Sequence, residues 1–329
     1  KYSLEEIRES RQFLKRVPLL LEDMVLGERF RETRIVHYTD DLDKEKIKQF
    51  AAVTFVLPDG TNYISFRGTD STITGWKEDF LMSFMSETEG AKEAEEDFHM
   101  TYMKEIPAQN HALQYLKGFI TEYPNQKIML AGHSKGGNFA MYASAFCDEA
   151  VKERIAKVYN NDGPGFREEI INSREYQDIL PKICNIVPQT SIIGQLLSND
   201  GEEKIIKSNA VGLFQHDAMT WEVTKDKFVA DELDAFSNFV KVSLGSWLEK
   251  IDDETRQSVV STVFSMIEET EAETFEEFSE SLFKNTRIML KVLVKLPKEK
   301  RNELMSALST LVQVSGKTAL DKIPKIPSK

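Results

Sequence analysis

The sequence predicts an α/β fold, in which a mixed, mostly parallel sheet is flanked by helices and followed by an all-helical C-terminal appendage. Three observations support this prediction. Two early strand-like runs are joined by a hairpin turn, strands and helices then alternate, and strand signals vanish from about residue 231 onward. Alternation of strands and helices is typical of a parallel sheet covered by helices, and the hairpin adds an antiparallel start. We therefore expect an α/β domain at residues 1–230, with an N-terminal helical segment, and a helical appendage at residues 231–329.

Short-range signals define the elements of the first domain. The capping box Ser3-Leu4-Glu5-Glu6 opens a helix that runs to about Arg16, and Pro58-Asp59-Gly60 is a hairpin turn. The expected strands cover residues 34–38, 50–57, 62–66, 127–130, 157–160, 182–187 and 204–207. The further helices are expected at residues 91–104, at 108–122 and from about 135.

Apolar residues at helical spacing define the appendage. They are Leu233, Phe236, Phe239, Val240, Leu244 and Trp247, then Val259, Val260, Val263, Phe264 and Ile267. A second capping box at residues 274–277 precedes Phe278, Leu282, Met289 and Leu293, and Pro297 fits a helix first turn before Leu304, Leu308 and Leu311. This pattern favours three or four helices that pack on themselves and on the first domain. A cap over a site, or a surface for a protein partner, is the alternative.

Composition limits the classes of function. The 329 residues are 41% hydrophobic and have a net charge of −12, which argues against nucleic acid as a partner. The same charge disfavours docking on anionic membranes unless a local basic face exists. No apolar run reaches the ~18 residues of a membrane span. Cys147 and Cys184 lie in apolar runs and are expected to be buried, reduced thiols. No signal peptide is visible, so we expect a cytoplasmic protein.

The segment Gly132-His133-Ser134-Lys135-Gly136-Gly137 is the most informative motif. An apolar strand-like run precedes it and a helix-like stretch follows, which is the setting of a serine nucleophile elbow. The bend is tight, so the positions two before and two after Ser134 need glycine, and both have it. The alternative is an ordinary glycine-rich turn in which Ser134 is only a helix cap.

A second loop is the candidate partner of the elbow. Arg67-Gly68-Thr69-Asp70 follows an expected strand, and Trp76 lies a few residues later. An oxyanion hole needs two backbone N–H groups, and we assign them to Lys135, directly after the serine, and to Thr69. Gly68 allows close backbone approach to a substrate. Trp76 is either part of a lid or substrate-binding wall, or a core residue of a helix.

These motifs together resemble the fungal-type triacylglycerol lipases of the α/β-hydrolase superfamily, which have a Phe-Arg-Gly-Ser/Thr loop, a nearby lid tryptophan and a Gly-His-Ser-Leu-Gly-Gly elbow. The chain more closely resembles a bacterial lipase-like family with four marks, found here at Gly132–Gly137, Asp162–Phe166, Val187–Gly194 and Gln215–Trp221. The resemblance covers roughly residues 30–225 and implies a serine hydrolase fold.

Chain order then selects the base, because α/β-hydrolases place nucleophile, acid and histidine in that sequence. Of the five histidines only His216 lies well downstream of Ser134. His133, beside the serine, is expected to pack or hydrogen-bond locally and to contact substrate. Asp162 is the favoured acid, because it ends a strand-like run, although a turn aspartate of purely structural role is the alternative. Asp217 is the rival acid.

Two departures from the lipases matter. Lys135 replaces their usual leucine or methionine, and could favour an acidic substrate group or pair with a local carboxylate. The lipases have their acid in an Asp-x-Val-Pro pattern, where this chain has Asn185. A complete triad would therefore need the acid one strand earlier, at Asp162.

The resulting hypothesis is a lipase- or esterase-like serine hydrolase that cleaves a small-molecule or lipid carboxylic ester through an acyl-enzyme on Ser134. No cofactor is predicted, and no metal, because the histidines lack paired spacing. A thioesterase, acyltransferase or peptidase would use the same residues. The non-enzymatic alternative is a degenerate hydrolase fold that binds a partner through its C-terminal helices, and Asn185 is its main support.

Overall fold

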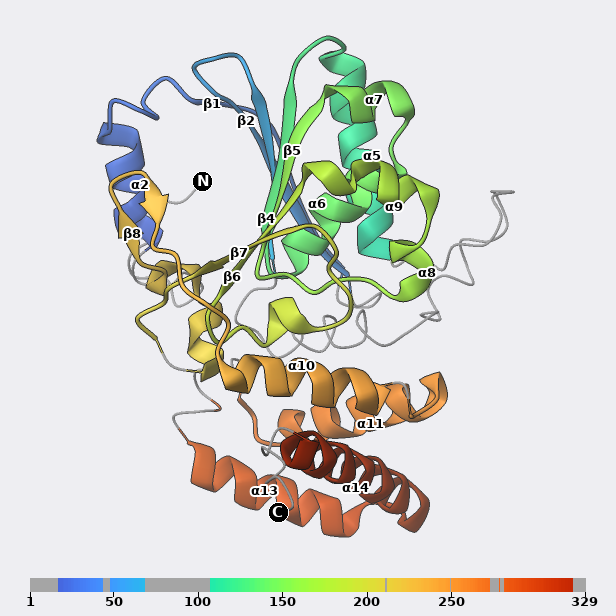
Figure 1. Cartoon of the computed structure of the whole chain (residues 1–329). Helices are drawn as coiled ribbons and strands as arrows, with labels where there is room; N and C mark the ends of the chain where they lie inside the picture. The colour runs from blue at the N-terminus through green and yellow to red at the C-terminus, as the bar shows by residue number, and fades with distance from the viewer. Residues whose placement is uncertain are drawn as a thin grey trace, which may run out of the picture. The chain divides into compact units, whose positions relative to one another are not determined.

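The protein forms two compact units (Figure 1). The computed structural model describes residues 17–43, 48–68, 107–210, 212–248, 250–272, 278 and 281–321. The first unit contains Lys1–Asp70, Pro107–Gly194 and Ser198–Glu232, and the second contains Ser71–Ile106, Gln195–Leu197 and Leu233–Lys329. The helices expected at residues 3–16 and 91–104, together with Thr69, Trp76 and the capping box at 274–277, lie outside the described residues.

A seven-stranded mixed sheet forms the centre of the first unit. Its strands follow chain order from one edge to the other: β1 (Arg34–Asp43), β2 (Lys48–Val56), β3 (Asn62–Phe66), β4 (Ile128–His133), β5 (Ile155–Asn161), β6 (Ile183–Pro188) and β7 (Glu202–Ile206). The first two pairings are antiparallel and the remaining four are parallel. The predicted fold class, a mixed and mostly parallel sheet with helices and a helical C-terminal part, is confirmed.

The predicted hairpin joins β2 to β3, where Val56 pairs with Asn62. Gly60 has a φ of 82°, a conformation that glycine adopts without steric cost, and its N–H donates to the carbonyl oxygen of Leu57 at 2.9 Å. The first strand is longer than the predicted 34–38. Its polar half is held by pairing with β2 as far as Asp43 opposite Lys48, so partner hydrogen bonds override the sequence signal.

Helices α5 (Pro107–Glu122) and α6 (Lys135–Phe146) lie together on one face of the sheet (Figure 1). Helix α6 is buried along almost its whole length and packs on β3, β4 and β5. An aromatic layer joins sheet and helices, with Phe50 6.1 Å from both Phe66 and Phe139 between ring centroids. This packing holds the N-terminus of α6 at the ends of the central strands.

Besides short 3-10 helices, the described part of the first unit has six further elements. They are α2 (Val17–Leu26), α7 (Glu149–Arg154), α8 (Glu168–Ile171), α9 (Arg174–Ile179), β8 (Val223–Thr224) and β9 (Lys227–Phe228). Both cysteines are free and buried, as expected, and burial raises the pKa of the Cys147 thiol to about 12.

The second unit is helical in its described part, with α10 (Ala235–Leu248), α11 (Asp253–Glu268), α13 (Leu282–Lys295) and α14 (Lys298–Asp321). Its core contains the predicted Trp247, Val260 and Phe264, and the indole N–H of Trp247 donates to the carbonyl oxygen of Ala307 at 2.9 Å.

Two predicted core positions are wrong. Leu308 in α14 is 40% exposed, because the buried face of that helix is formed by Leu304 and Ala307. Phe236 is 53% exposed, because it lies in the first turn of α10, where the apolar pattern extends beyond the packed part of the helix.

Candidate functional site

The elbow is built where β4 turns directly into α6. Ser134 is the single residue between them and has φ 56° and ψ −132°, which is a strained conformation for a residue with a side chain. A Cβ at Gly132 would overlap the backbone of Gly136, and one at Gly136 would overlap the carbonyl oxygen of Phe66. The glycines are therefore required by close backbone approach, as the motif predicts.

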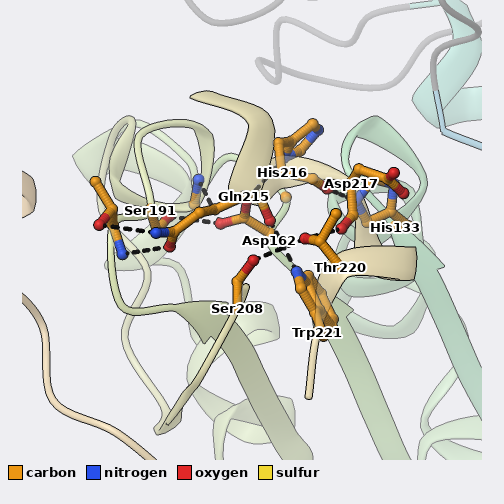
Figure 2. Close-up of polar contacts among 12 residues, drawn as sticks. His133, Asp162, Ser191, Ser208, Gln215, His216, Asp217, Thr220 and Trp221 are labelled. Carbon is orange, nitrogen blue, oxygen red and sulfur yellow. Dashed lines mark hydrogen bonds and ion pairs between the residues drawn. The ribbon is translucent and has the colours of Figure 1, made fainter. Parts of the chain in front are cut away.

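A carboxylate and an imidazole meet beside this bend. Asp162 follows the last residue of β5, and its Oδ2 accepts a hydrogen bond from Nδ1 of His216 at 2.7 Å (Figure 2). Asp162 is 1% exposed and has a φ of 50°, so its carboxylate is held inside the protein by a bent backbone. This contact orients the His216 ring and fixes the proton on Nδ1.

The second oxygen of the carboxylate has partners of its own. Oδ1 accepts from the hydroxyl of Ser191 at 2.5 Å and from the backbone N–H of Gly194 at 3.1 Å. Charge-assisted bonds of this kind stabilise an ionised carboxylate in a buried position. Sequence reasoning assigned neither residue a role. The only sequence signal for these contacts is that both residues lie in the segment Val187–Gly194, one of the four marks of the lipase-like family.

Hydrogen bonds hold the loop that contains His216 in place on both sides of this residue. His133 Nε2 donates to the carbonyl oxygen of His216 at 2.7 Å, and the two rings lie 4.6 Å apart between centroids. The indole N–H of Trp221 donates to the carbonyl oxygen of Gln215 at 2.8 Å (Figure 2). The Gln215 side chain accepts from the N–H of Thr190 at 2.9 Å. These hydrogen bonds fix the backbone of Gln215 and His216, and with it the position of the imidazole.

His133 is neutral at ordinary pH. Burial, with a smaller contribution from the nearby His216, lowers the pKa of His133 to about 3, against the opposing effect of its hydrogen bond to the His216 backbone. Because the neutral ring has one N–H and Nε2 uses it on a carbonyl, the local packing predicted for His133 is what the geometry shows. Its contact with substrate stays a prediction.

Three contacts bring the elbow and the acid–imidazole pair to one place. The N–H of Ser134 donates to the carbonyl oxygen of Asn161, the residue before Asp162, at 2.9 Å. A Cβ at Gly163, the residue after Asp162, would overlap the carbonyl oxygen of Ser134. The third contact joins His133 to His216, as described above. Because β4 and β5 are parallel neighbours, their carboxyl ends deliver Ser134 and Asp162 to the same edge of the sheet.

The two rival acid positions have other roles. Asn185 in β6 lies opposite Asn160 in β5 and accepts a hydrogen bond from the Asn160 side chain at 3.0 Å. Asp217 accepts from the N–H of Met219 at 2.9 Å and so caps the short helix Ala218–Thr220. The carboxylate that contacts the His216 ring therefore comes from Asp162, at the end of β5, and not from β6, where Asn185 lies.

Besides His133, two of the predicted oxyanion and substrate residues are described. Lys135 is the first residue of α6 and is 1% exposed, and its Nζ lies 5.9 Å from the ring centroid of Phe139. A Cβ at Gly68 would lie 3.2 Å from Cβ of Ser134, so the end of β3 reaches the elbow. Thr69 and Trp76 lie outside the described residues.

Among the described residues, no three His, Cys, Asp or Glu side chains gather in a way that could hold a metal ion. In the same part of the chain, no helix combines the length and the apolar character needed to cross a membrane.

Comparison with known proteins gives one family. A family model described as Mbeg1-like matches residues 24–95 and 94–265. A search of curated proteins finds no match.

Solved structures similar to the chain include three fungal lipases. The native propeptide complex of Rhizomucor miehei lipase is 18% identical with a TM-score of 0.39, and the match covers 64% of this chain and 65% of that one. Lipase II from Rhizopus niveus is 15% identical with a TM-score of 0.38, over 56% and 71% of the two chains. Lip2 lipase from Yarrowia lipolytica is 16% identical with a TM-score of 0.33, over 53% and 66%. This chain thus spans less than two thirds of the length of the Rhizomucor miehei lipase.

Proposed function

This chain belongs to the Mbeg1-like family, and we propose that it is a serine hydrolase that cleaves carboxylic esters through an acyl-enzyme on Ser134. The main support is the 2.7 Å contact between Asp162 Oδ2 and His216 Nδ1, formed directly beside a serine on a strained strand-to-helix bend. An aspartate with a purely structural role, or a serine that only caps a helix, would not require a carboxylate–imidazole pair beside a strained bend. Each group has the chemistry of a triad member.

In the proposed reaction, Ser134 Oγ attacks the ester carbonyl carbon while His216 Nε2 takes the hydroxyl proton. The tetrahedral intermediate then collapses, the bond to the alcohol oxygen breaks, and His216 returns the proton to the departing alcohol. Water attacks the acyl-serine in the same way, with His216 again as general base. The carboxylate of Asp162 keeps the ring in the tautomer that leaves Nε2 to accept a proton, and stabilises the imidazolium that forms.

The developing oxyanion would be held by backbone N–H groups. We assign one to Lys135, which begins α6, because a helix N-terminus directs N–H groups and positive potential at this position. The second is assigned to Thr69, next to Gly68, which approaches Cβ of Ser134.

A fluorophosphonate probe tests the proposal, because it phosphonylates only an activated serine. We expect labelling of the wild-type protein and none of Ser134→Ala, with His216→Ala labelled at least a hundredfold more slowly. Ser144→Ala, which removes a buried hydroxyl of α6 away from the bend, is the matched control and should label normally. Folded protein that remains unlabelled would favour the scaffold alternative.

The acyl acceptor and leaving group need a separate measurement. A panel of ester, thioester and peptide substrates with a common acyl group should give the highest kcat/KM with the ester. A preference for the thioester would identify a thioesterase, and transfer of the acyl group to an added alcohol in place of hydrolysis would identify an acyltransferase. Either enzyme would use the same catalytic residues.

A further inference from the structure

Helix α13 is basic in an otherwise acidic protein. From residue 282 to residue 301 the chain has seven Lys and Arg residues and a single acidic residue, Glu299, although its net charge is −12. The basic residues of α13 itself are all exposed: Lys284, Arg287, Lys291 and Lys295. Within the described chain, no ion pair links any of these four to a carboxylate, so their charges face solvent unneutralised.

The same helix exposes large apolar side chains. Phe283 is 95% exposed, Leu290 is 56% exposed and Val294 is 71% exposed. Their spacings of seven and four residues place them on one face of the helix. The packing of the helical unit is supplied by other residues of α13, Met289, Val292 and Leu293, which contact its core. The exposed face is therefore additional to the one that stabilises the fold.

The two features lie next to each other around the helix axis. With 3.6 residues per turn, the three exposed apolar residues fall within an arc of about 40°, and the four basic residues occupy the adjoining ~80° on one side. An apolar strip with a basic strip beside it is the arrangement of a helix that lies in the plane of a membrane surface. A helix face that contacts only water would gain nothing from a large apolar side chain such as Phe283.

We propose that α13 is a docking surface for an anionic lipid bilayer. Phe283, Leu290 and Val294 enter the boundary between headgroups and acyl chains, and the basic residues contact acidic headgroups. Positive charge selects an anionic surface, and the apolar strip selects a lipid over a purely polar polyanion. The net negative charge of the protein is screened beyond ~8 Å at physiological salt, so the local charge of the helix governs the contact.

The proposal does not depend on the hydrolase assignment. The family match ends at residue 265, so α13 lies outside the region that defines the family. Ser134→Ala should bind vesicles like the wild-type protein while losing the fluorophosphonate label, so the two proposals can fail separately.

Co-sedimentation with vesicles tests the surface directly. At about 0.1 M salt the whole protein should bind phosphatidylcholine vesicles that contain about one third phosphatidylserine, and should not bind phosphatidylcholine alone. Each basic residue at an anionic surface changes partitioning by about fivefold, so the triple variant Lys284→Gln/Lys291→Gln/Lys295→Gln should bind about a hundredfold more weakly. Phe283→Ser should lose about tenfold.

Matched variants separate the helix from the protein as a whole. Lys127→Gln/Lys227→Gln/Lys250→Gln removes the same charge from three exposed positions outside α13 and should leave binding unchanged. Leu26→Ser removes a side chain that is 81% exposed on α2 and should also have no effect.

Three results would overturn the proposal. The first is a triple variant of α13 that binds as tightly as the wild-type protein, and the second is an equal loss in the control triple, which would make net charge the cause. The third is sedimentation-velocity evidence of dimers that Phe283→Ser dissociates, without vesicle binding, because the face would then be an interface between two copies.

Discussion

At the scale of single residues, the candidate site depends on how one buried carboxylate is held. Asp162 is 1% exposed, and both of its oxygens accept hydrogen bonds, from His216 on one side and from Ser191 and Gly194 on the other. An ionised group in such a position is retained only when its bonds compensate for lost hydration. The carboxylate thus has a fixed orientation before any substrate arrives.

Replacing Asp162 by asparagine should abolish most of the proposed activity. The amide keeps the shape of the side chain but cannot stabilise an imidazolium, and it favours the wrong tautomer of His216. We expect kcat for ester hydrolysis to fall about 10³–10⁴-fold with little change in KM. Asp217→Asn, which alters the neighbouring cap, is the control and should keep its kcat. Equal losses in both variants would point to a general disturbance of the loop.

His133 should make the folded state sensitive to acid. Its pKa is about 3 in the folded protein, below the ordinary 6.5, so the unfolded chain binds a proton that the folded chain excludes. The stabilisation is complete above pH 6.5 and is lost as the pH falls from there toward 3. Between pH 7.5 and 5, the free energy of unfolding should fall by up to about 2 kcal/mol more in the wild-type protein than in His133→Gln. Equal losses in urea titrations of the two proteins would contradict the assignment.

At the scale of elements, the site is made by neighbouring parallel strands whose carboxyl ends are in contact. The segment after β4 and the segment after β5 are joined by the bond from Ser134 N–H to the carbonyl oxygen of Asn161. Gly163 lies so close to Ser134 that no side chain fits between them. Two turns, rather than two independent loops, therefore hold Ser134 and Asp162, the proposed nucleophile and the proposed acid, together.

Gly163→Ala should disrupt this junction. The added Cβ would overlap the carbonyl oxygen of Ser134 and the side-chain oxygen of Asn160, and neither can move without shifting a strand. We expect a loss of about 1–3 kcal/mol in unfolding free energy, together with loss of fluorophosphonate labelling. Gly118→Ala is the matched control, because its Cβ meets nothing within 4 Å on α5. It should stabilise the protein by about 0.5–1 kcal/mol.

The elements also mark what the sequence could and could not predict. The strand at residues 62–66 is predicted with its observed bounds, because a turn and an alternating pattern define both ends. Ser134, Asp162 and His216 were identifiable because each has a local motif and a place in chain order. Ser191 and Gly194 were not, since their contact with Asp162 depends on how the loop after β6 folds back, which no local pattern encodes. The presence of an asparagine at position 185 is explained only by its hydrogen bond with Asn160 on the neighbouring strand.

At the scale of the whole molecule, each compact unit has its own apolar interior. The helical unit has a core around Trp247, Val260 and Phe264, and the sheet unit has its aromatic layer around Phe50 and Phe139. Units with separate cores are expected to respond separately to a core defect. The predicted boundary near residue 231 stays a prediction that such a response would test.

A cavity in the helical core should therefore destabilise that unit alone. Phe264 is 3% exposed, and Phe264→Ala should cost about 3–5 kcal/mol because the surrounding helices cannot fill the space. Trp247 reports on this unit and Trp221 on the other, each measured by fluorescence with the remaining tryptophans replaced by phenylalanine. We expect the urea transition of Trp247 to move to lower concentration and that of Trp221 to stay. Leu308→Ala, at a position 40% exposed on α14, should shift neither by more than about 0.5 kcal/mol. A common shift of both tryptophans in Phe264→Ala would mean that the two units unfold as one cooperative body.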